Sequence, residues 1–279
     1  MKFILASIVL FLSFQVKAQD PVVIIDQMKA SIKKIKTYSF ELHSRERFGS
    51  KFITKKLLFH MQESPKKVYM KDMDKGIELL YVKGWNSNNA YINPNGMPWI
   101  NVSLSIYDNK VISENHHTIN DLGLSFVPVL LEGFEKTIEA SGKTRNDIYT
   151  YLGETVWNGK ACYKIQLVSP TEFKYISYTT DRDQKLMELS RRIVASDYLI
   201  KEKNRVNYTR TIKKGTTLTV PSAYAAKVIV YIEKSTKLPL VQTLYDDKGF
   251  FEKFEYKNVN LSPNFGSKEW TTDCLDYGF

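Results

Sequence analysis

The 279-residue sequence contains only two cysteines, and so few exclude a disulfide-built scaffold and a cysteine-rich metal site. After its first residues it has no apolar run near the ~20 residues that a membrane-spanning helix needs, so no transmembrane segment is expected. It also lacks the Gly-x-Ser-x-Gly nucleophile turn, the His-Glu-x-x-His zinc motif, the P-loop and the dinucleotide-binding glycine pattern. These absences argue against an enzyme, and we expect no cofactor and no metal ion.

What the sequence does contain is enough apolar material for a core. Hydrophobic residues make up 43% of it and aromatic residues 13%, which excludes a disordered or low-complexity chain. At about 100–200 residues per domain, the length predicts one large or two modest domains. The many Tyr and Phe residues favour strands.

The charge is positive but dispersed. Forty Lys and Arg residues against 30 Asp and Glu give a formal net charge of +10. Most are lysines in scattered pairs such as Lys55-Lys56 and Lys213-Lys214, whereas nucleic-acid-binding proteins usually carry a clustered, arginine-rich stripe. We therefore expect no nucleic-acid partner, and interpret the lysines as a solvated surface facing anionic lipid or cell wall.

The first 18 residues have the pattern of a secretory signal peptide. Lys2 precedes an apolar run from Phe3 to Phe14, and small residues at Val16 and Ala18 indicate cleavage after Ala18. The run is too short to span a bilayer. The sequence thus predicts a periplasmic or secreted protein.

The mature chain changes its hydrophobic period several times. Asp20-Pro21 is typical of a helix start, and apolar residues then recur at helical spacing. From Thr37 onward the period is two, which predicts a strand meander. Gly123–Ala140 returns to helical spacing with a broad apolar face, capped by Ser125. Trp157-Asn158-Gly159-Lys160 predicts a tight hairpin, so the sheet should be antiparallel.

This order of elements resembles the periplasmic lipoprotein-carrier fold of LolA, LolB and the RseB sensor. The local matches are Pro65–Met70, Gly153–Leu167, Leu238–Leu240 and Tyr256–Leu261. The resemblance implies an α+β fold in which an antiparallel half-barrel, formed by residues 19–172 and 225–279, is closed by helices. Members of that fold hold acyl chains or lipid-modified peptides in an apolar interior. The residues that we expect to line such an interior are Phe40, Leu42, Phe59, Tyr69, Leu79, Leu131, Phe134, Ile165, Val230, Phe254 and Tyr256.

Residues 173–224, between the two parts of the half-barrel, resemble a LysM module, which is a strand, two short helices and a second strand. The matching segments are Tyr175–Thr179, Asp183–Ala195, Asp197–Asn204 and Ile212–Pro221. The usual glycine-aspartate turn after the first strand is replaced by residues 180–183. LysM modules bind N-acetylglucosamine polymers such as peptidoglycan, which would make Asn204, Arg205 and Tyr208 glycan-binding residues. The alternative is a helical insertion without a ligand.

Two further sets of residues could take part in chemistry, a pair of histidines and the two cysteines. His116-His117 is the best catalytic or metal candidate, but its sequence neighbourhood offers no cysteine or carboxylate pair to complete a ligand set. We expect the pair to pack the turn before the Ser125 helix; an enzyme would need a cleft in which a histidine meets a carboxylate. Alternation along the strand places Cys162 on the outer face of the sheet. Export permits a disulfide with Cys274, and two free thiols are the alternative.

Taken together, the sequence predicts an exported, non-enzymatic binding protein of the cell envelope whose partner is an apolar ligand, such as a lipid or an acylated peptide. The alternative is a structural or sensory envelope protein with a filled barrel, acting through peptidoglycan or protein contacts. An empty apolar cavity would favour the first interpretation, and a barrel packed with side chains would favour the second.

Overall fold

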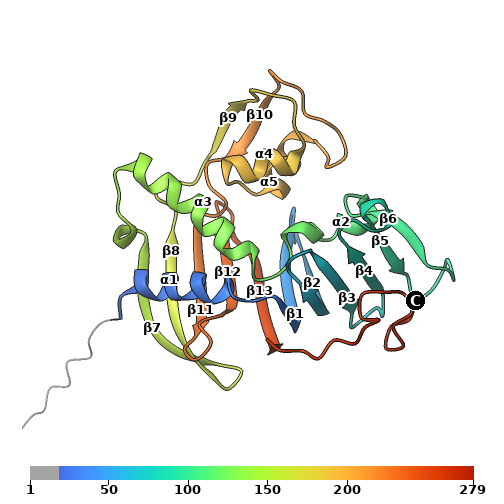
Figure 1. The fold of residues 1–279 in the computed structure, drawn as a ribbon. Coiled ribbons are helices and arrows are strands. Elements are labelled where there is room, and N and C mark those ends of the chain that lie inside the picture. Colours follow the sequence, from blue (N-terminus) through green and yellow to red (C-terminus); the bar gives the residue numbers. More distant parts are fainter. Residues whose placement is uncertain (1–18) are drawn as a thin grey trace, which may run out of the picture.

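The computed structural model describes residues 19–279, so the expected signal peptide, residues 1–18, lies outside the described residues. Figure 1 shows one long, curved sheet with two helices against one face and a small unit above it. None of the helices in residues 19–279 combines the length and apolar character that a bilayer-spanning segment requires.

The main sheet has eleven strands in the spatial order β6-β5-β4-β3-β2-β1-β13-β12-β11-β8-β7, and neighbouring strands are antiparallel. Their bounds are β1 (Thr37–Phe48), β2 (Lys51–Gln62), β3 (Lys67–Asp72), β4 (Glu78–Val82), β5 (Asn89–Asn93), β6 (Val102–Ser105), β7 (Tyr149–Trp157), β8 (Lys160–Val168), β11 (Lys227–Glu233), β12 (Pro239–Asp246) and β13 (Gly249–Asn260). The end strands β6 and β7 do not pair with each other. The sheet is therefore open, and the expected antiparallel architecture is confirmed.

Helix α1 (Pro21–Ile32) begins where the sequence predicts. The Asp20 side chain accepts a hydrogen bond from the Val22 N–H at 2.8 Å, and Pro21 occupies the first turn. The helix buries Ile24, Ile25, Met28 and Ile32, which belong to the largest core cluster of the protein. This apolar stripe holds α1 against the sheet.

Helix α3 (Phe126–Ser141) is the broad apolar helix predicted from the sequence. The expected cap, Ser125, donates its hydroxyl to Glu63 Oε2 at 2.7 Å instead. Lys29 of α1 forms an ion pair with Glu135 of α3 at 2.8 Å. The two helices lie on the same face of the sheet, over β7, β8, β11 and β12 (Figure 1).

The predicted hairpin between β7 and β8 is present. Asn158 has φ 49° and Gly159 has φ 75°, the two positive φ values that a type I′ turn requires. By contrast, the short elements between β5 and α3 were not predicted: β6, helix α2 (Asn109–Ile112) and a 3-10 turn at Ile119–Asp121. Elements this short carry too few residues to show a period.

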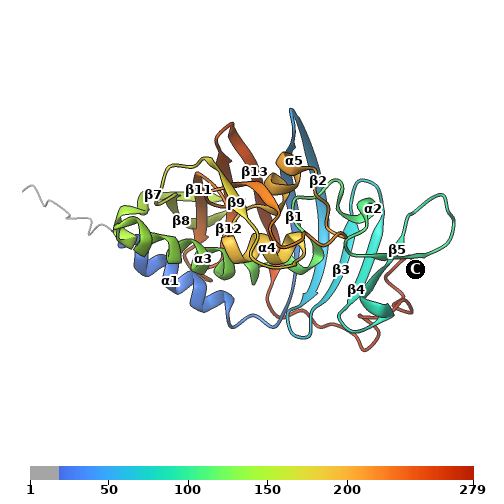
Figure 2. The same cartoon turned by 90° about the horizontal axis from the view of Figure 1, so that it is seen from above.

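Residues 173–224 form a separate unit, the inserted module. Strand β9 (Tyr175–Thr179) pairs with β10 (Thr217–Pro221) in antiparallel register, and helices α4 (Leu186–Ile193) and α5 (Asp197–Asn204) come between them. The module has its own apolar cluster, to which Ile112 of α2 also belongs. Figure 2 shows it lying over the main sheet and α3. The order of elements is the predicted one, and the LysM identity of the module stays a prediction.

Of the two alternatives for the cysteines, the structure has the free thiols: Cys162 and Cys274 are not bonded to each other. Cys162 is fully buried and belongs to the main core cluster. Alternation along β8 gave no sign of this burial, although β8 pairs with β11 in unbroken register from Val168 to Cys162. Cys274 packs in a different cluster, against the outer side of β3 and β4 with Tyr277.

Candidate ligand-binding site

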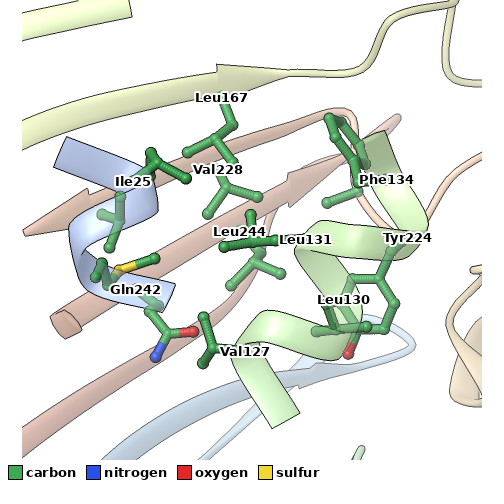
Figure 3. A pocket seen from close by; sticks show the side chains of 13 residues that line it. Ile25, Val127, Leu130, Leu131, Phe134, Leu167, Tyr224, Val228, Gln242 and Leu244 are labelled. Atoms are coloured by element: carbon green, nitrogen blue, oxygen red, sulfur yellow. The ribbon is translucent and has the colours of Figure 1, made fainter. Parts of the chain in front are cut away.

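The first cavity lies between helices α1 and α3 and the strands beneath them. Its walls are Ile25, Met28, Val127, Leu130, Leu131, Phe134, Leu167, Tyr224, Ala225, Val228, Val230, Gln242 and Leu244. The space between the atoms, with its opening to solvent, is about 590 Å³, and about 70 Å³ is open to the centre of a water molecule. Figure 3 shows the side chains of both helices and of the strands converging on this space.

The lining of the first cavity is almost entirely apolar. Among the residues that the structure describes, only Gln242 and Tyr224 bring polar side-chain atoms to it. The Gln242 side chain lies near the Tyr256 hydroxyl, but its Nε2 is buried and, within residues 19–279, has no partner at hydrogen-bonding geometry. This is uncommon, because buried amides are nearly always paired. A cavity with these walls is unfavourable for water, and it offers one free hydrogen-bond donor.

A second cavity, of about 500 Å³, continues from the first beneath α3. Five residues line both: Val127, Leu130, Tyr224, Gln242 and Leu244. The second cavity adds aromatic walls from β1, β2 and β13 and ends at His117, Asp121 and Glu252. It is therefore apolar at the end next to the first cavity and charged at the other.

A third cavity, of about 390 Å³, lies between α3 and the inserted module. It shares His117, Asp121, Phe126, Leu130 and Tyr224 with the second cavity. Leu130 and Tyr224 line all three, so the cavities follow one another along α3.

A buried ion cluster forms the charged end of the second cavity. Glu252, fully buried on β13, has its Oε2 2.9 Å from His116 Nδ1 and 3.5 Å from His117 Nε2. Its Oε1 accepts a hydrogen bond from the Tyr224 hydroxyl at 3.3 Å. Glu46 Oε2 accepts from the His116 backbone N–H at 2.6 Å. The two histidines thus meet carboxylates that are distant in sequence.

The protonation states of the cluster follow from burial and from the opposite charges within it. Burial raises the pKa of Glu252, but the His117 charge and hydrogen bonds from both histidines outweigh it and lower that pKa to about 2. Burial lowers the pKa of His117, but the charge of Glu252 and its hydrogen bond raise it to about 9. At neutral pH Glu252 is an anion and His117 a cation.

The His116 ring is held by hydrogen bonds at both nitrogens and by stacking with neighbouring aromatic rings. Its Nε2 lies 2.8 Å from the Arg47 carbonyl oxygen, and its Nδ1 faces the Glu252 carboxylate. The rings of Tyr198 and Phe251 stack with it at centroid distances of 4.0 and 4.6 Å. His117 packs before α3 as expected, with its ring centroid 5.8 Å from that of Phe126, whereas His116 joins β1, β13 and α5.

The ligand atoms of Glu46, His116 and Glu252 lie within 4.8 Å of one another, a spacing that a metal ion could bridge. However, both His116 nitrogens already have hydrogen-bond partners, and the carboxylates accept from the same residue. The cluster is satisfied by its own ion pairs, so we interpret it as a structural centre that orients His117 towards the cavities.

Eight of the eleven side chains predicted to line an apolar interior do line the first or second cavity. They are Phe40, Leu42, Phe59, Leu131, Phe134, Val230, Phe254 and Tyr256. Leu79 and Ile165 lie in the main core without lining either cavity. Tyr69 was misplaced: its ring stacks on Tyr277 at 3.6 Å between centroids, in the cluster on the opposite side. The C-terminal segment covers that face of β3, which alternation alone could not indicate.

Two of the three residues proposed to bind glycan are engaged inside the module. The Asn204 amide donates to the carbonyls of Ile200 and Thr219, and its oxygen accepts from the Thr219 N–H, all at 2.7 Å. Tyr208 is 5% exposed and belongs to the module's core. Arg205 follows the end of α5 with φ 55°. Because Asn204 and Tyr208 have structural roles, the glycan-binding prediction loses its main contacts.

Sequence reasoning missed the residues that make the site polar. Gln242, Glu252 and Asp197 lie in segments assigned only to strand or helix, and no motif surrounds them. A usable signal for Glu252 exists: it interrupts an aromatic strand, Phe250-Phe251-Glu252-Lys253-Phe254, at a position where an alternating strand turns inward. Gln242 similarly stands between Val241 and Leu244 in an apolar strand.

Several solved structures resemble most of the chain at low sequence identity. A LolA superfamily protein from Nitrosomonas europaea is 9% identical with a TM-score of 0.35, covering 92% of this chain and 100% of its own. The lipoprotein LppX of Mycobacterium tuberculosis is 12% identical with a TM-score of 0.41, covering 88% and 99%. Pseudomonas aeruginosa MucB, in complex with MucA, is 9% identical with a TM-score of 0.39. The match covers 91% of this chain but only 61% of that one.

These TM-scores all lie below 0.5, so we infer the function of this chain from its own residues. A search of curated proteins gave no match. One family model matches residues 35–192, from the end of the segment after α1 to the end of α4. Because this match covers more than half of the sequence, the chain belongs to the family described as "Protein of unknown function (DUF1571)".

Proposed function

We propose that this protein is a non-enzymatic binding protein of the cell envelope that holds an apolar ligand, such as an acyl chain, between α3 and the main sheet. The observation that carries the proposal is the first cavity, a space with apolar walls enclosed by α1, α3, β8, β11 and β12. Well-packed interiors leave few voids larger than a water molecule. A void of this kind in an apolar core supports a binding role.

The size of the cavities suits a narrow ligand. The first cavity offers about 70 Å³ to water-sized centres and the adjoining second cavity about 50 Å³, where about 10–15 Å³ is enough for one water molecule. A slender chain of methylene groups fits such a continuous space, and each methylene removed from water contributes about 0.8 kcal/mol.

A titration with the neutral apolar dye N-phenyl-1-naphthylamine tests the proposal. We expect the dye to fluoresce on binding and to be displaced by 1-dodecanol. Leu131→Trp would fill the first cavity from α3, and we expect it to weaken dye binding about tenfold or more. Val23→Trp places the same side chain at an exposed position of α1 and should leave binding unchanged.

The test also separates the two interpretations made from the sequence. If the folded wild-type protein does not bind the dye or the alcohol at micromolar concentrations, the carrier proposal is wrong. A structural or sensory role, through protein or peptidoglycan contacts, would then be the better interpretation. If Leu131→Trp and Val23→Trp bind the dye equally, the ligand does not occupy the first cavity.

A further inference from the structure

The third cavity differs from the other two in its chemistry. The inserted module contributes Ser190, Arg191, Val194, Ala195 and Asp197 to its walls. About 20 Å³ is open to the centre of a water molecule, which is room for one or two waters or for one small polar group. This cavity lies at the charged end of the second cavity, so a ligand that enters the apolar space can reach it.

Asp197 has a free acceptor in this cavity. The residue is only 8% exposed. Burial raises the pKa of its carboxyl, and the Tyr208 hydroxyl lies near enough to lower that pKa, but Oδ2 is buried and, within residues 19–279, has no partner at hydrogen-bonding geometry. Asp197 begins α5, but the helix is already capped by Ser196, whose hydroxyl oxygen accepts from the Leu199 N–H at 3.3 Å. The free oxygen is therefore not needed for the helix. An unpaired carboxylate oxygen in a buried site is costly and should be satisfied by a donor from outside the chain.

The other charged groups that line the third cavity are already paired. Arg191 donates to Asp121 Oδ1, with Nε at 3.2 Å, and the Thr118 hydroxyl donates to Asp121 Oδ2 at 2.9 Å. His117 forms its ion pair with Glu252. Both cations that line the cavity thus have anionic partners, while Asp197 keeps one oxygen free. The site favours a hydrogen-bond donor and disfavours an anion.

We propose that the third cavity binds the head group of an amphiphile, a hydroxyl or an amine that donates a hydrogen bond to Asp197, while the aliphatic tail of the same molecule occupies the first two cavities. This inference rests on the proposed function and deepens it. The residues common to the three cavities, Leu130 and Tyr224, mark the path from tail to head. The inserted module then has a defined role, because it supplies Asp197.

Three probes with the same twelve-carbon tail test the head group: dodecylamine, 1-dodecanol and laurate, titrated calorimetrically below their micelle-forming concentrations at pH 7.5. We expect the amine to bind tightest, because a charged donor makes the strongest hydrogen bond to a carboxylate. The alcohol should follow, and laurate should bind at least about tenfold more weakly than the amine. Laurate binding as tightly as the amine would overturn the proposal without any variant.

Asp197→Asn keeps the shape of the side chain and replaces the free acceptor with a donor. We expect it to weaken the binding of the amine and of the alcohol about tenfold and to leave the binding of laurate no weaker. Asp181→Asn is the matched control, since Asp181 is exposed and paired with Arg192, and it should change none of the three affinities. Unchanged amine and alcohol binding in folded Asp197→Asn would contradict the proposal.

The neutral dye distinguishes a failure of this inference from a failure of the proposed function. If the dye binds but the three probes bind alike, the cavities hold an apolar ligand and only the head-group assignment is wrong. If neither the dye nor any probe binds, both proposals are wrong.

Discussion

Glu252 is a charged residue with no exposure to water, and it is tolerated because two histidines and a tyrosine meet its carboxylate. A buried ion is unfavourable unless it is paired and hydrogen-bonded. The same pairing ties strand β13 to the segment before α3, on which His116 and His117 lie. The cluster therefore fixes the position of one wall of the cavities.

This pairing predicts a pH dependence of stability. The pKa of His117 is about 9 in the folded protein against 6.5 in the unfolded chain. The protonated His117 therefore stabilises the fold fully below pH 6.5, and this stabilisation is lost as the pH rises towards 9. We expect the free energy of unfolding to fall by about 3 kcal/mol over this range. Urea unfolding at several pH values measures it.

The fall should be absent in His117→Gln, which cannot take up the proton. His43→Gln is the control, because burial and the Lys257 charge lower the pKa of that histidine instead, and it should keep the wild-type profile between pH 6.5 and 9. An identical profile for wild type and His117→Gln would show that the ion pair with Glu252 does not stabilise the fold.

Removing the side-chain amide should have opposite effects on stability at Gln242 and at Asn204. Gln242→Met removes the unpaired Nε2 while keeping the chain length, and we expect the free energy of unfolding to stay the same or to rise by up to about 1 kcal/mol. Asn204→Leu removes three hydrogen bonds to the backbone of Ile200 and Thr219 and should lower the free energy of unfolding by about 2–3 kcal/mol. Chemical denaturation of both variants measures this, and a loss of similar size in each would contradict the assignment of Gln242 as unpaired.

At the scale of elements, helix α3 approaches the inserted module at a glycine. A Cβ built on Gly133 would lie 2.6 and 2.8 Å from the two γ carbons of Val194, at the end of α4. Such separations are too short for carbon atoms, and the branched Val194 side chain cannot move aside freely. Gly133 therefore sets how closely the module can pack on α3, and with it the width of the third cavity.

Gly133→Ala should lower the free energy of unfolding by about 1 kcal/mol, because overpacking of 1–3 kcal/mol exceeds the gain of about 1 kcal/mol in helix propensity. In a Val194→Ala background the clash is relieved, and the same change should become neutral or stabilising. Thermal denaturation of the four proteins forms a double-mutant cycle. Equal effects of Gly133→Ala in both backgrounds would show that the contact with Val194 is unimportant.

The elements that the sequence predicted correctly are those with many repeats of one signal. Helix α3 repeats its apolar spacing over four turns, and the β7–β8 hairpin carries Asn158-Gly159, which suits the two positive φ values found there. The apolar walls of the cavities followed from the same patterns. Tyr69 was misplaced because the C-terminal segment buries its face of β3. The burial of Cys162 could not be seen from the alternation of β8, whose register with β11 is unbroken.

The polar groups of the site could not be predicted by the same means. Gln242, Glu252 and Asp197 lie on three different elements, and their relation depends on how β13, β12 and the inserted module meet. A local sequence pattern does not indicate which distant elements pack together. Only the interruption of an aromatic strand by Glu252 gave a local sign of a buried charge.

At the scale of the whole molecule, the two free thiols should differ in reactivity. Cys162 is fully buried in the main core and Cys274 is partly exposed near the C-terminus. We expect a maleimide reagent to label Cys274 in the folded protein and to reach Cys162 only after global unfolding. Mass spectrometry of native and denatured samples counts the labels.

Two labels on the denatured, unreduced protein are required by this structure, and none would indicate a disulfide after all. Cys274→Ser provides the control, since it should show no label when folded and one when denatured. Rapid labelling of Cys162 in the folded protein would indicate that the β7–β8 end of the sheet opens locally.

The pairing of β1 with β13 joins residues from the two ends of the chain, as in Ser39 with Asn260. Contacts between residues so far apart in sequence slow folding, because a long loop must close before they form. Strands β1 to β6 follow one another and can assemble as soon as they emerge, but β1 then presents unpaired backbone groups until the C-terminal strand arrives. Such an edge can pair with other chains. A folding intermediate with an exposed β1 edge would therefore be the species most prone to aggregate, and the one that a chaperone would have to protect.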